Sequence, residues 1–298
     1  MPQTPANGIT IEYETFGNAS DPAVLLVMGL GAQLTLWPIE LVEALVARGF
    51  RVIRYDNRDI GLSTKFDDAG VPDIAAVTMA RIQGRAPDVP YALADMAEDG
   101  VALLDALGIA RAHVVGASMG GMIAQLIAAT HPTRVLSLTS IMSTTGNPAV
   151  PPAKPEAMAV LMQRPAGTDE DTMVEFGTTA ARTIGSPGYP FDEERARDRV
   201  RRDYRRSFSP TGFARQMAAI IADGDRRERL KAVTAPTLVI HGDGDPLVPV
   251  EGGRDTAASI PGAELKVIPG MGHDLPLGLV DEIAEAIAGV AAKARTAA

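Results

Sequence analysis

A single serine stands between two glycines at the point where an apolar strand meets a helix, in the stretch VVGASMGGMIAQ. The residues from Ala112 to Val115 are typical of a short buried strand, and after Ser118 apolar residues recur at helical spacing. A turn this sharp forces its central residue into a strained backbone conformation, and Gly116 and Gly120 relieve the crowding around it. We therefore expect the hydroxyl of Ser118 to point out of the sheet, where it could act as a nucleophile.

A serine hydroxyl attacks a substrate well only when a base takes its proton, so the four histidines of the chain are the candidates for that base. His113, His131 and His241 lie at the ends of predicted strands or helices, where packing or structural hydrogen bonds are expected. His273 lies in the glycine-rich loop PGMGHDLP, between the last predicted strand and the last helix. Ligands bind at the carboxyl ends of the strands in open α/β sheets, so we assign the base to His273.

The base needs a carboxylate that fixes its tautomer and stabilises its charged form. The stretch HGDGDPLVP follows a predicted strand and offers Asp243 and Asp245. Asp243 lies beside glycine, where Asp commonly bonds its own turn, whereas Asp245 lies further out on the loop and nearer His273. The segment SIMSTTGN, after the strand that ends near Met142, holds no carboxylate. We assign the acid to Asp245 and keep Asp243 as the alternative.

The tetrahedral intermediate of an acyl transfer also needs hydrogen-bond donors for its oxyanion. We predict that one donor is the backbone N–H of Met119, directly after the serine. The other is predicted in the loop MGLGAQLTLW, at the backbone N–H of Leu30. Gly29 and Gly31 in this loop would let the backbone come close to a substrate, and a simple tight turn is the alternative reading.

Strand-like and helix-like segments alternate over about the first 144 residues, which predicts a doubly wound, mostly parallel α/β sheet. ITIEYETFG, from Ile9, alternates apolar and polar residues as an edge strand does. AVLLVMG, from Ala23, is apolar throughout, as buried parallel strands are. The stretches from Ile39 and from Tyr91 to Gly108 have helical periodicity, and RVIRYD, from Arg51, reads as a further strand.

The alternation stops at residue 144 and resumes at residue 231. Residues 145–230 are rich in Pro, Gly, Met and charge, with helical patterns and no convincing strand. Strands then follow at APTLVIHG and AELKVIPG, and a final helix is predicted from about Pro276 to Ala292. We predict an α/β core of residues 1–144 and 231–298, with residues 145–230 inserted as a helical cap.

The predicted cap carries aromatic residues that could enclose an apolar substrate. Phe176, Tyr189 and Phe213 are predicted to contact the substrate together with Gly29, and core packing is the alternative for the aromatic residues. Trp37, which follows the Leu30 loop, is predicted either to line the part of the site that binds the acyl group or to pack in the core. The arginine-rich stretch DEERARDRVRRDYRRS favours a solvated helix face or a subunit contact over a clamp for an anion.

The composition of the chain excludes several kinds of partner and of catalysis. The chain has 298 residues, 46% of them hydrophobic, and a formal net charge of −9, which disfavours nucleic acid or an anionic membrane as a partner. It has no cysteine, which excludes thiol catalysis and thiolate metal sites. No apolar run approaches the roughly 20 residues of a membrane span, and the N-terminus lacks a signal-peptide pattern. We predict a cytoplasmic enzyme without cofactor or metal that acts on a small-molecule ester; whether it forms a homo-oligomer is left open.

Five motifs occur in order along the chain: LLVMGLG, VIRYDNRDIGLS, AHVVGASMGG, PTLVIHGDGDPLVP and IPGMGHDLP. Through them the chain resembles the α/β-hydrolase superfamily of serine hydrolases, and most of all its aclacinomycin methylesterase and carboxylesterase branch. The resemblance implies the α/β-hydrolase fold and the nucleophile–acid–base order of Ser118, Asp245 and His273. It also implies hydrolysis of carboxylic esters through an acyl-enzyme, and structural roles for Asp56 and Arg58 beneath the site.

Related chemistries stay open at this point. A cofactor-free perhydrolase of the haloperoxidase type also carries the sequence SMGG, and proline iminopeptidases share the scaffold. A ligand receptor built on the same scaffold is the non-enzymatic alternative. Such receptors often have a damaged triad, whereas Ser118, Asp245 and His273 are all present here.

Overall fold

The computed structural model describes residues 2–163 and 165–296, with the side chains of 295 and 296 left aside. Its centre is an eight-stranded sheet in the order β1-β2-β4-β3-β5-β6-β7-β8. The strands are β1 (Gln3–Ala6), β2 (Ile9–Phe16), β3 (Ala23–Val27), β4 (Arg51–Tyr55), β5 (Ala112–Ala117), β6 (Val135–Ile141), β7 (Thr237–Gly242) and β8 (Glu264–Ile268). From β4 to β8 all neighbours pair in parallel, while β1–β2 and β2–β4 are antiparallel. The predicted doubly wound, mostly parallel sheet is confirmed.

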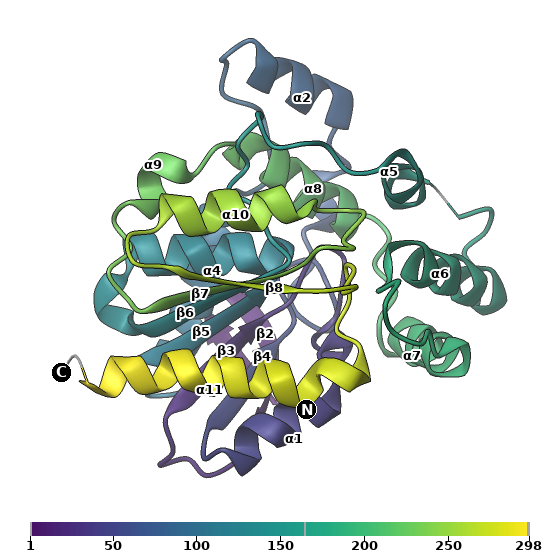
Figure 1. Ribbon diagram of the computed structural model, residues 1–298. Coiled ribbons are helices and arrows are strands. Elements are labelled where there is room, and N and C mark those ends of the chain that lie inside the picture. The colour runs from purple at the N-terminus through teal and green to yellow at the C-terminus, as the bar shows by residue number, and fades with distance from the viewer. Residues whose placement is uncertain (1, 164, 297–298) are drawn as a thin grey trace.

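Helices cover both faces of the sheet (Figure 1), with α1 and α11 on one side and α4 and α10 on the other. The helices outside the predicted cap are α1 (Ile39–Ala47), α2 (Ile74–Ile82), α3 (Leu93–Ala106), α4 (Met119–Thr130), α10 (Val250–Ser259) and α11 (Val280–Thr296). Short 3₁₀ turns add η1 (Leu34–Leu36), η2 (Asp67–Ala69), η3 (Pro132–Arg134) and η4 (Leu277–Leu279). The final helix was predicted from Pro276; the chain there first forms η4, and α11 begins at Val280.

The continuous apolar run of β3 follows from its place between two cores. Leu25 and Val27 belong to the buried cluster beneath α3 and α4, whereas Val24 and Leu26 belong to the cluster beneath α1 and α11. Successive side chains of a strand point to opposite faces, so a strand covered on both sides needs apolar residues at every position. All five residues of β3 are buried.

The prediction that the strand from Ile9 forms the sheet edge is wrong, because β1 pairs outside it. A two-residue turn at Asn7 and Gly8, with φ of 49° and 75°, joins β1 to β2 and brings Ala6 opposite Ile9. Asn-Gly favours this tight hairpin because both residues tolerate positive φ. Most residues of β2 are half-buried, as expected for a strand next to the edge that has only a short partner beyond it.

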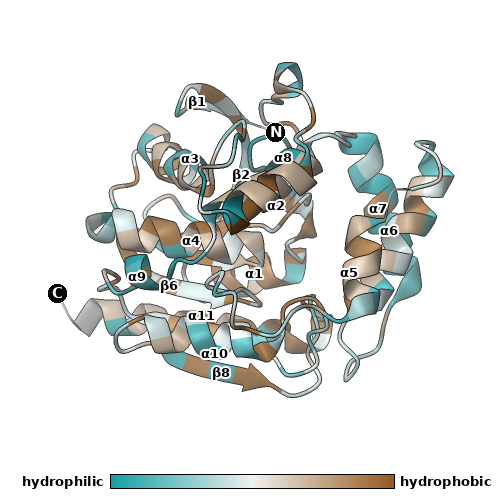
Figure 2. Cartoon of the chain, turned by 90° about the horizontal axis from the view of Figure 1, so that it is seen from above, coloured by the Kyte–Doolittle hydropathy of each residue, from teal (hydrophilic) through white to brown (hydrophobic). Residues whose placement is uncertain are grey.

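Between β6 and β7 the described residues form helices and no strand. These are α5 (Pro155–Met162), α6 (Glu170–Ile184), α7 (Glu193–Arg206), α8 (Gly212–Asp223) and α9 (Arg227–Leu230). Seen from above, α5, α6 and α7 lie together at one side of the molecule (Figure 2). In contrast, α8 packs against α2 and α3, and α9 packs against α4 and α10. The division of the chain at residues 144 and 231 stays a prediction.

A helix that crosses a bilayer needs about 20 mostly apolar residues. None of the described helices is both long and apolar enough to span a membrane.

Two glycines let three backbone segments meet where β5 passes into α4. A Cβ added to Gly116 would overlap the carbonyl of Gly120, and a Cβ added to Gly120 would overlap the carbonyl of Val27. Both obstacles are backbone atoms, which cannot move aside as the end of a flexible side chain can. The start of α4 is therefore pressed against β5 and against the end of β3.

We predict that Gly116→Ala lowers the free energy of unfolding by about 3 kcal/mol or more, because the added methyl group overpacks a backbone crossing. Urea unfolding followed by circular dichroism measures the change. Gly289→Ala is the matched control: Gly289 lies on α11 with nothing within 4 Å of an added Cβ. Alanine there should stabilise the protein by about 0.5–1 kcal/mol. A Gly116→Ala protein as stable as the parent would show that the crossing is looser than described.

Candidate active site

Ser118 occupies the turn between β5 and α4 with a strained backbone. Its φ is 57° and its ψ is −122°, a region that residues with a side chain rarely adopt. Such a conformation costs of order 1–3 kcal/mol and persists only when its surroundings hold it. The Ser118 N–H donates to the carbonyl of Ile141 at 3.0 Å, and the Ser143 hydroxyl donates to the Ser118 carbonyl at 2.8 Å. The backbone of the serine is therefore fixed by the end of β6 and the residues directly after it, and its hydroxyl is left for other partners.

The structure brings the three predicted triad residues together. Ser118 Oγ lies 2.9 Å from His273 Nε2, and His273 Nδ1 lies 2.7 Å from Asp245 Oδ2. Asp245 is 4% exposed, and its Oδ1 accepts the backbone N–H groups of Leu247 and Val248, both at 2.9 Å. One carboxylate oxygen is thus held by the loop, and the other faces the imidazole.

The end of α6 supports the loop that carries His273. The backbone N–H of His273 donates to the carbonyl of Ile184 at 2.8 Å. The Ser186 hydroxyl accepts from the N–H of Gly272 at 2.8 Å and bonds the carboxyl of Asp274, whose pKa is raised by burial. The base is therefore positioned partly by residues of the predicted cap, which the sequence did not indicate.

Asp243, the alternative acid, bonds the turn after β8 instead of the imidazole. Its Oδ1 accepts the backbone N–H of Gly270 at 2.7 Å. This contact fixes the start of the turn that leads to His273, so the two aspartates have different partners. The geometry favours Asp245 as the residue next to the base.

The other histidines make structural contacts. His241 is fully buried, its Nε2 donates to the carbonyl of Val248 at 2.8 Å, and burial lowers its pKa. Its Nε2 also lies 3.6 Å from Asp245 Oδ2, so a neutral ring there leaves the carboxylate to His273. His113 bonds the hydroxyl of Ser137, and half-buried His131 bonds Glu98.

The predicted oxyanion donors lie on two sides of the serine. Met119 is the first residue of α4, so its N–H has no acceptor within the helix. The Leu30 N–H has no backbone acceptor among the described residues. A Cβ added to Gly29 would lie 3.1 Å from Ser118 Cβ, which puts this loop directly against the nucleophile. Both N–H groups are therefore available beside the hydroxyl.

Residues distant in the sequence fix the loop from Met28 to Trp37, here called the oxyanion loop. The side-chain amide of Asn57 donates to the carbonyl of Met28 at 2.8 Å, and Asp56 Oδ1 accepts the N–H of Leu34 at 2.8 Å. The N–H of Gly31 donates to Gln216 Oε1 of α8 at 2.8 Å. The structural role expected of Asp56 agrees with these contacts, whereas Asn57 and Gln216 were not singled out from the sequence.

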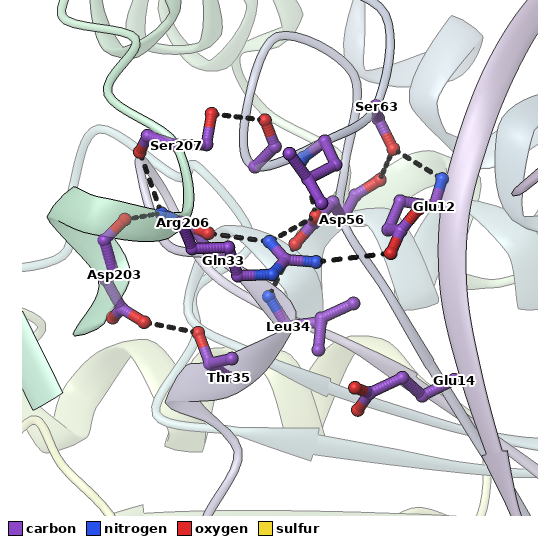
Figure 3. Close-up of polar contacts among 12 residues, drawn as sticks. Glu12, Glu14, Gln33, Leu34, Thr35, Asp56, Ser63, Asp203, Arg206 and Ser207 are labelled. Carbon is purple, nitrogen blue, oxygen red and sulfur yellow. Dashed lines mark hydrogen bonds and ion pairs between the residues drawn. The ribbon is translucent and has the colours of Figure 1, made fainter. Parts of the chain in front are cut away.

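The end of α7 is tied to the same loop (Figure 3). The Arg206 guanidinium bonds Asp56 Oδ2 at 2.7 Å and Gln33 Oε1 at 2.6 Å, and it lies 3.7 Å from Glu12. The Gln33 amide nitrogen in turn donates to the carbonyls of Asp203 and Ser207 at 2.7 and 3.0 Å. A buried polar network therefore joins α7 to the oxyanion loop.

Most other arginines of the α7 stretch form exposed ion pairs. Arg195 pairs with Glu40 of α1, and Arg205 pairs with Glu170 of α6. Exposed pairs of this kind contribute little, typically about 0–1 kcal/mol each. Most arginines of this stretch therefore form ion pairs at the surface. Arg206 differs from them because its side chain is 9% exposed.

The predicted substrate contacts lie in different surroundings. Phe213 of α8 faces the oxyanion loop, since a Cβ on Gly31 would lie 2.7 Å from its ring. Tyr189 lines an open cavity of about 400 Å³ that also borders Asp274. Phe176 is half-buried on α6, while Trp37 is fully buried in the core cluster beneath α1 and α11.

Taken together, the site holds an activated hydroxyl, an imidazole with its carboxylate, and two N–H donors. This set of groups suits acyl transfer, in which negative charge develops on a carbonyl oxygen. Among the described residues, no group of three or more His, Asp or Glu side chains could hold a metal ion.

Comparisons with known proteins show the family and the fold. A family profile described as alpha/beta hydrolase fold matches residues 22–277. Rhodomycin D methylesterase DauP of Streptomyces sp. strain C5 is 33% identical, covering 94% of this chain and 94% of its own length. Rhodomycin D methylesterase DnrP of Streptomyces peucetius is 32% identical over the same shares. The crystal structure of the enol-lactonase from Burkholderia xenovorans LB400 superposes with a TM-score of 0.73 at 24% identity, covering 97% of this chain and 99% of that one.

We predict that Asp245→Asn lowers kcat by roughly 10⁴-fold, because an amide at this position favours the wrong tautomer of His273. Asp243→Asn is the matched control and should cost far less, since Asp243 bonds only the backbone of Gly270. Steady-state hydrolysis of a chromogenic ester measures both. If the two effects were reversed, Asp243 would be the acid.

Proposed function

This chain belongs to the alpha/beta-hydrolase family, and on that premise we propose that it cleaves carboxylic esters through an acyl-enzyme formed on Ser118. It is a carboxylic ester hydrolase, similar over nearly its whole length to two methylesterases. The observation that carries the proposed mechanism is the chain of hydrogen bonds from Ser118 Oγ through His273 to Asp245, at 2.9 and 2.7 Å.

In the first half of the reaction, Ser118 Oγ attacks the carbonyl carbon of the ester while His273 Nε2 takes its proton. Asp245 stabilises the imidazolium that forms and keeps Nδ1–H directed toward itself. The carbonyl oxygen gains negative charge and accepts hydrogen bonds from the N–H groups of Leu30 and Met119. When the tetrahedral intermediate collapses, the bond to the alcohol oxygen breaks, and His273 gives its proton to the leaving alcohol.

In the second half, water replaces the alcohol. His273 takes a proton from the water, whose oxygen attacks the acyl carbon in the same oxyanion site. The bond to Ser118 Oγ then breaks, the serine regains its proton from His273, and the carboxylic acid leaves. Each group returns to its starting state, so the two halves use one set of residues.

We propose methyl esters as the preferred substrate class. The names of both similar methylesterases support this choice. Methanol is a small leaving group that needs little space, so selectivity would depend on the acyl part of the ester. In this proposal residues 145–230 act as the cap, and Phe213, Tyr189 and Phe176 meet the acyl part beside Gly29.

We predict that Ser118→Ala abolishes ester hydrolysis, with a loss on the order of 10⁶-fold in kcat, while the unfolding midpoint changes little. A panel of methyl esters and p-nitrophenyl esters measures the activity, and a fluorophosphonate probe should label the parent at Ser118 only. Ser140→Ala is the control, because it removes a buried hydroxyl of β6 from outside the triad and should keep the labelling. Activity of Ser118→Ala within tenfold of the parent would contradict the proposed nucleophile.

We predict that alanine at Phe213, Tyr189 or Phe176 changes the relative kcat/KM among esters by about 10- to 200-fold, the range that apolar pocket contacts supply. Fluorophosphonate labelling should persist, because the triad is untouched. Phe208→Ala serves as the control, since this exposed ring packs on Tyr204. If all three variants kept the parent's ester preferences, the loops around Leu30 would have to determine specificity.

A further inference from the structure

A buried glutamine of α8 spans the space between the oxyanion loop and the loop after β4. Gln216 is 0% exposed, its Oε1 accepts the N–H of Gly31 at 2.8 Å, and its Nε2 donates to the carbonyl of Arg58 at 2.8 Å. We propose that Gln216 is a positioning residue that orients the Leu30 N–H toward the oxyanion. The inference rests on the proposed function, in which that N–H stabilises the tetrahedral intermediate.

The bond to Gly31 controls Leu30 because peptide groups are planar. The Gly31 N–H lies in one plane with the Leu30 carbonyl, so holding that N–H fixes the plane on one side of Leu30. On the other side, the Asn57 amide holds the Met28 carbonyl at 2.8 Å and fixes the plane that precedes Gly29. The peptide group that carries the Leu30 N–H lies between these two fixed planes.

The oxyanion loop lacks stiffness of its own. Gly29 has little room for a side chain because it lies against Ser118, and Gly31 has a φ of 69° that favours glycine. Glycine has the widest choice of backbone conformations, so a loop with two of them needs outside contacts to keep one geometry. A hydrogen-bond donor stabilises a transition state best when it is already oriented before the reaction.

Gln216 is itself held firmly enough to serve as a reference point. Both ends of its amide are engaged, and the preceding residue, Arg215, is fully buried in a bidentate pair with Asp59 at 2.8 Å. The Tyr91 hydroxyl donates to the same carboxylate at 2.7 Å. A side chain whose neighbours are locked by packing and hydrogen bonds can position another group accurately.

The same helix also places Phe213 against Gly31, one turn before Gln216. In α8, residues three apart lie on one face, so the aromatic ring and the amide meet the same glycine. A substrate that shifts the ring of Phe213 would therefore also shift Gly31 and the peptide group that Gln216 holds. The predicted cap segment thereby contributes to the chemical step as well as to the pocket.

The test compares Gln216→Leu with Gln125→Leu. Gln125 is also a fully buried helical glutamine, but its amide bonds Ser140 and Arg226, away from the oxyanion loop. Both variants should lower the unfolding midpoint by similar amounts. Only Gln216→Leu should lower kcat, by about 10²-fold, with KM within a few-fold of the parent, because a small misplacement of a catalytic donor acts on the transition state.

Two further measurements separate positioning from a merely structural role. A trifluoromethyl ketone forms a tetrahedral adduct on the serine, so its affinity should fall in proportion to kcat/KM in Gln216→Leu and stay unchanged in Gln125→Leu. Gln216→Glu keeps the acceptor for Gly31. Burial against the Arg58 carbonyl favours the neutral form of the new carboxyl, whose O–H can replace the lost N–H donor, so this variant should recover most of the lost kcat. In Gln216→Leu the midpoint of the pH–rate profile should equal that of the parent, because His273 and Asp245 are unchanged.

Equal kcat losses in Gln216→Leu and Gln125→Leu, or an unchanged affinity for the ketone, would overturn the inference. If Gln216→Leu does not fold, Gln216→Met and Gln125→Met, which keep the side-chain volume, take the place of the two leucine variants. A loss of kcat and of ketone affinity in Gln216→Met alone supports the inference, and equal effects in both variants overturn it. An active Ser118→Ala protein would instead remove the proposed function itself. An inactive Ser118→Ala protein with a fully active Gln216→Leu protein would remove this inference alone.

Discussion

The close approach of three backbone segments at the start of α4 is the constraint on which the site depends. Gly116 lets β5 and α4 touch, and Gly120 presses α4 against the last residue of β3. Since the oxyanion loop begins directly after β3, this one crossing sets both the nucleophile and the loop that faces it. Gly29 then lies against the side chain of Ser118. Hydrogen bonds to Ile141 of β6 and from Ser143, just after β6, hold the strained backbone of Ser118. The sheet therefore stabilises a conformation that the turn alone would not keep.

Patterns that are local in the sequence predicted much of the fold and of the proposed triad. The apolar run of β3 and the strand–serine–helix junction each express their structure within a few residues, and His273 follows the last strand as a fold rule demands. The hairpin of β1 was not predicted, although Asn7 and Gly8 form the strongest short hairpin signal. A strand of four residues carries too short an alternation to stand out without that turn.

The contacts that support the site could not be predicted, because they join residues far apart in the chain. Gln216 and Gly31 are 185 residues apart, and Arg206 and Gln33 are 173 apart. A polar residue on a helix normally indicates the solvent face, so periodicity assigns Gln216 and Arg206 to the surface. Trp37 illustrates the same limit, since its position at the end of the oxyanion loop does not reveal that its ring is fully buried. Burial of polar groups becomes visible only when their partners are known.

These supports also change how the predicted cap relates to the chemistry. The end of α6 holds the backbone of His273, and α8 holds Gly31, so helices inserted between β6 and β7 contact both the base and the oxyanion loop. Separating α8 from the core would break the fully buried pair of Arg215 and Asp59 together with the hydrogen bond from Gly31 to Gln216. An opening motion at α8 would therefore dismantle the oxyanion site along with the pocket. In the proposed function we therefore expect a substrate to enter past those parts of α5, α6 and α7 that make no such contact, and we expect those surfaces to vary most with the ester.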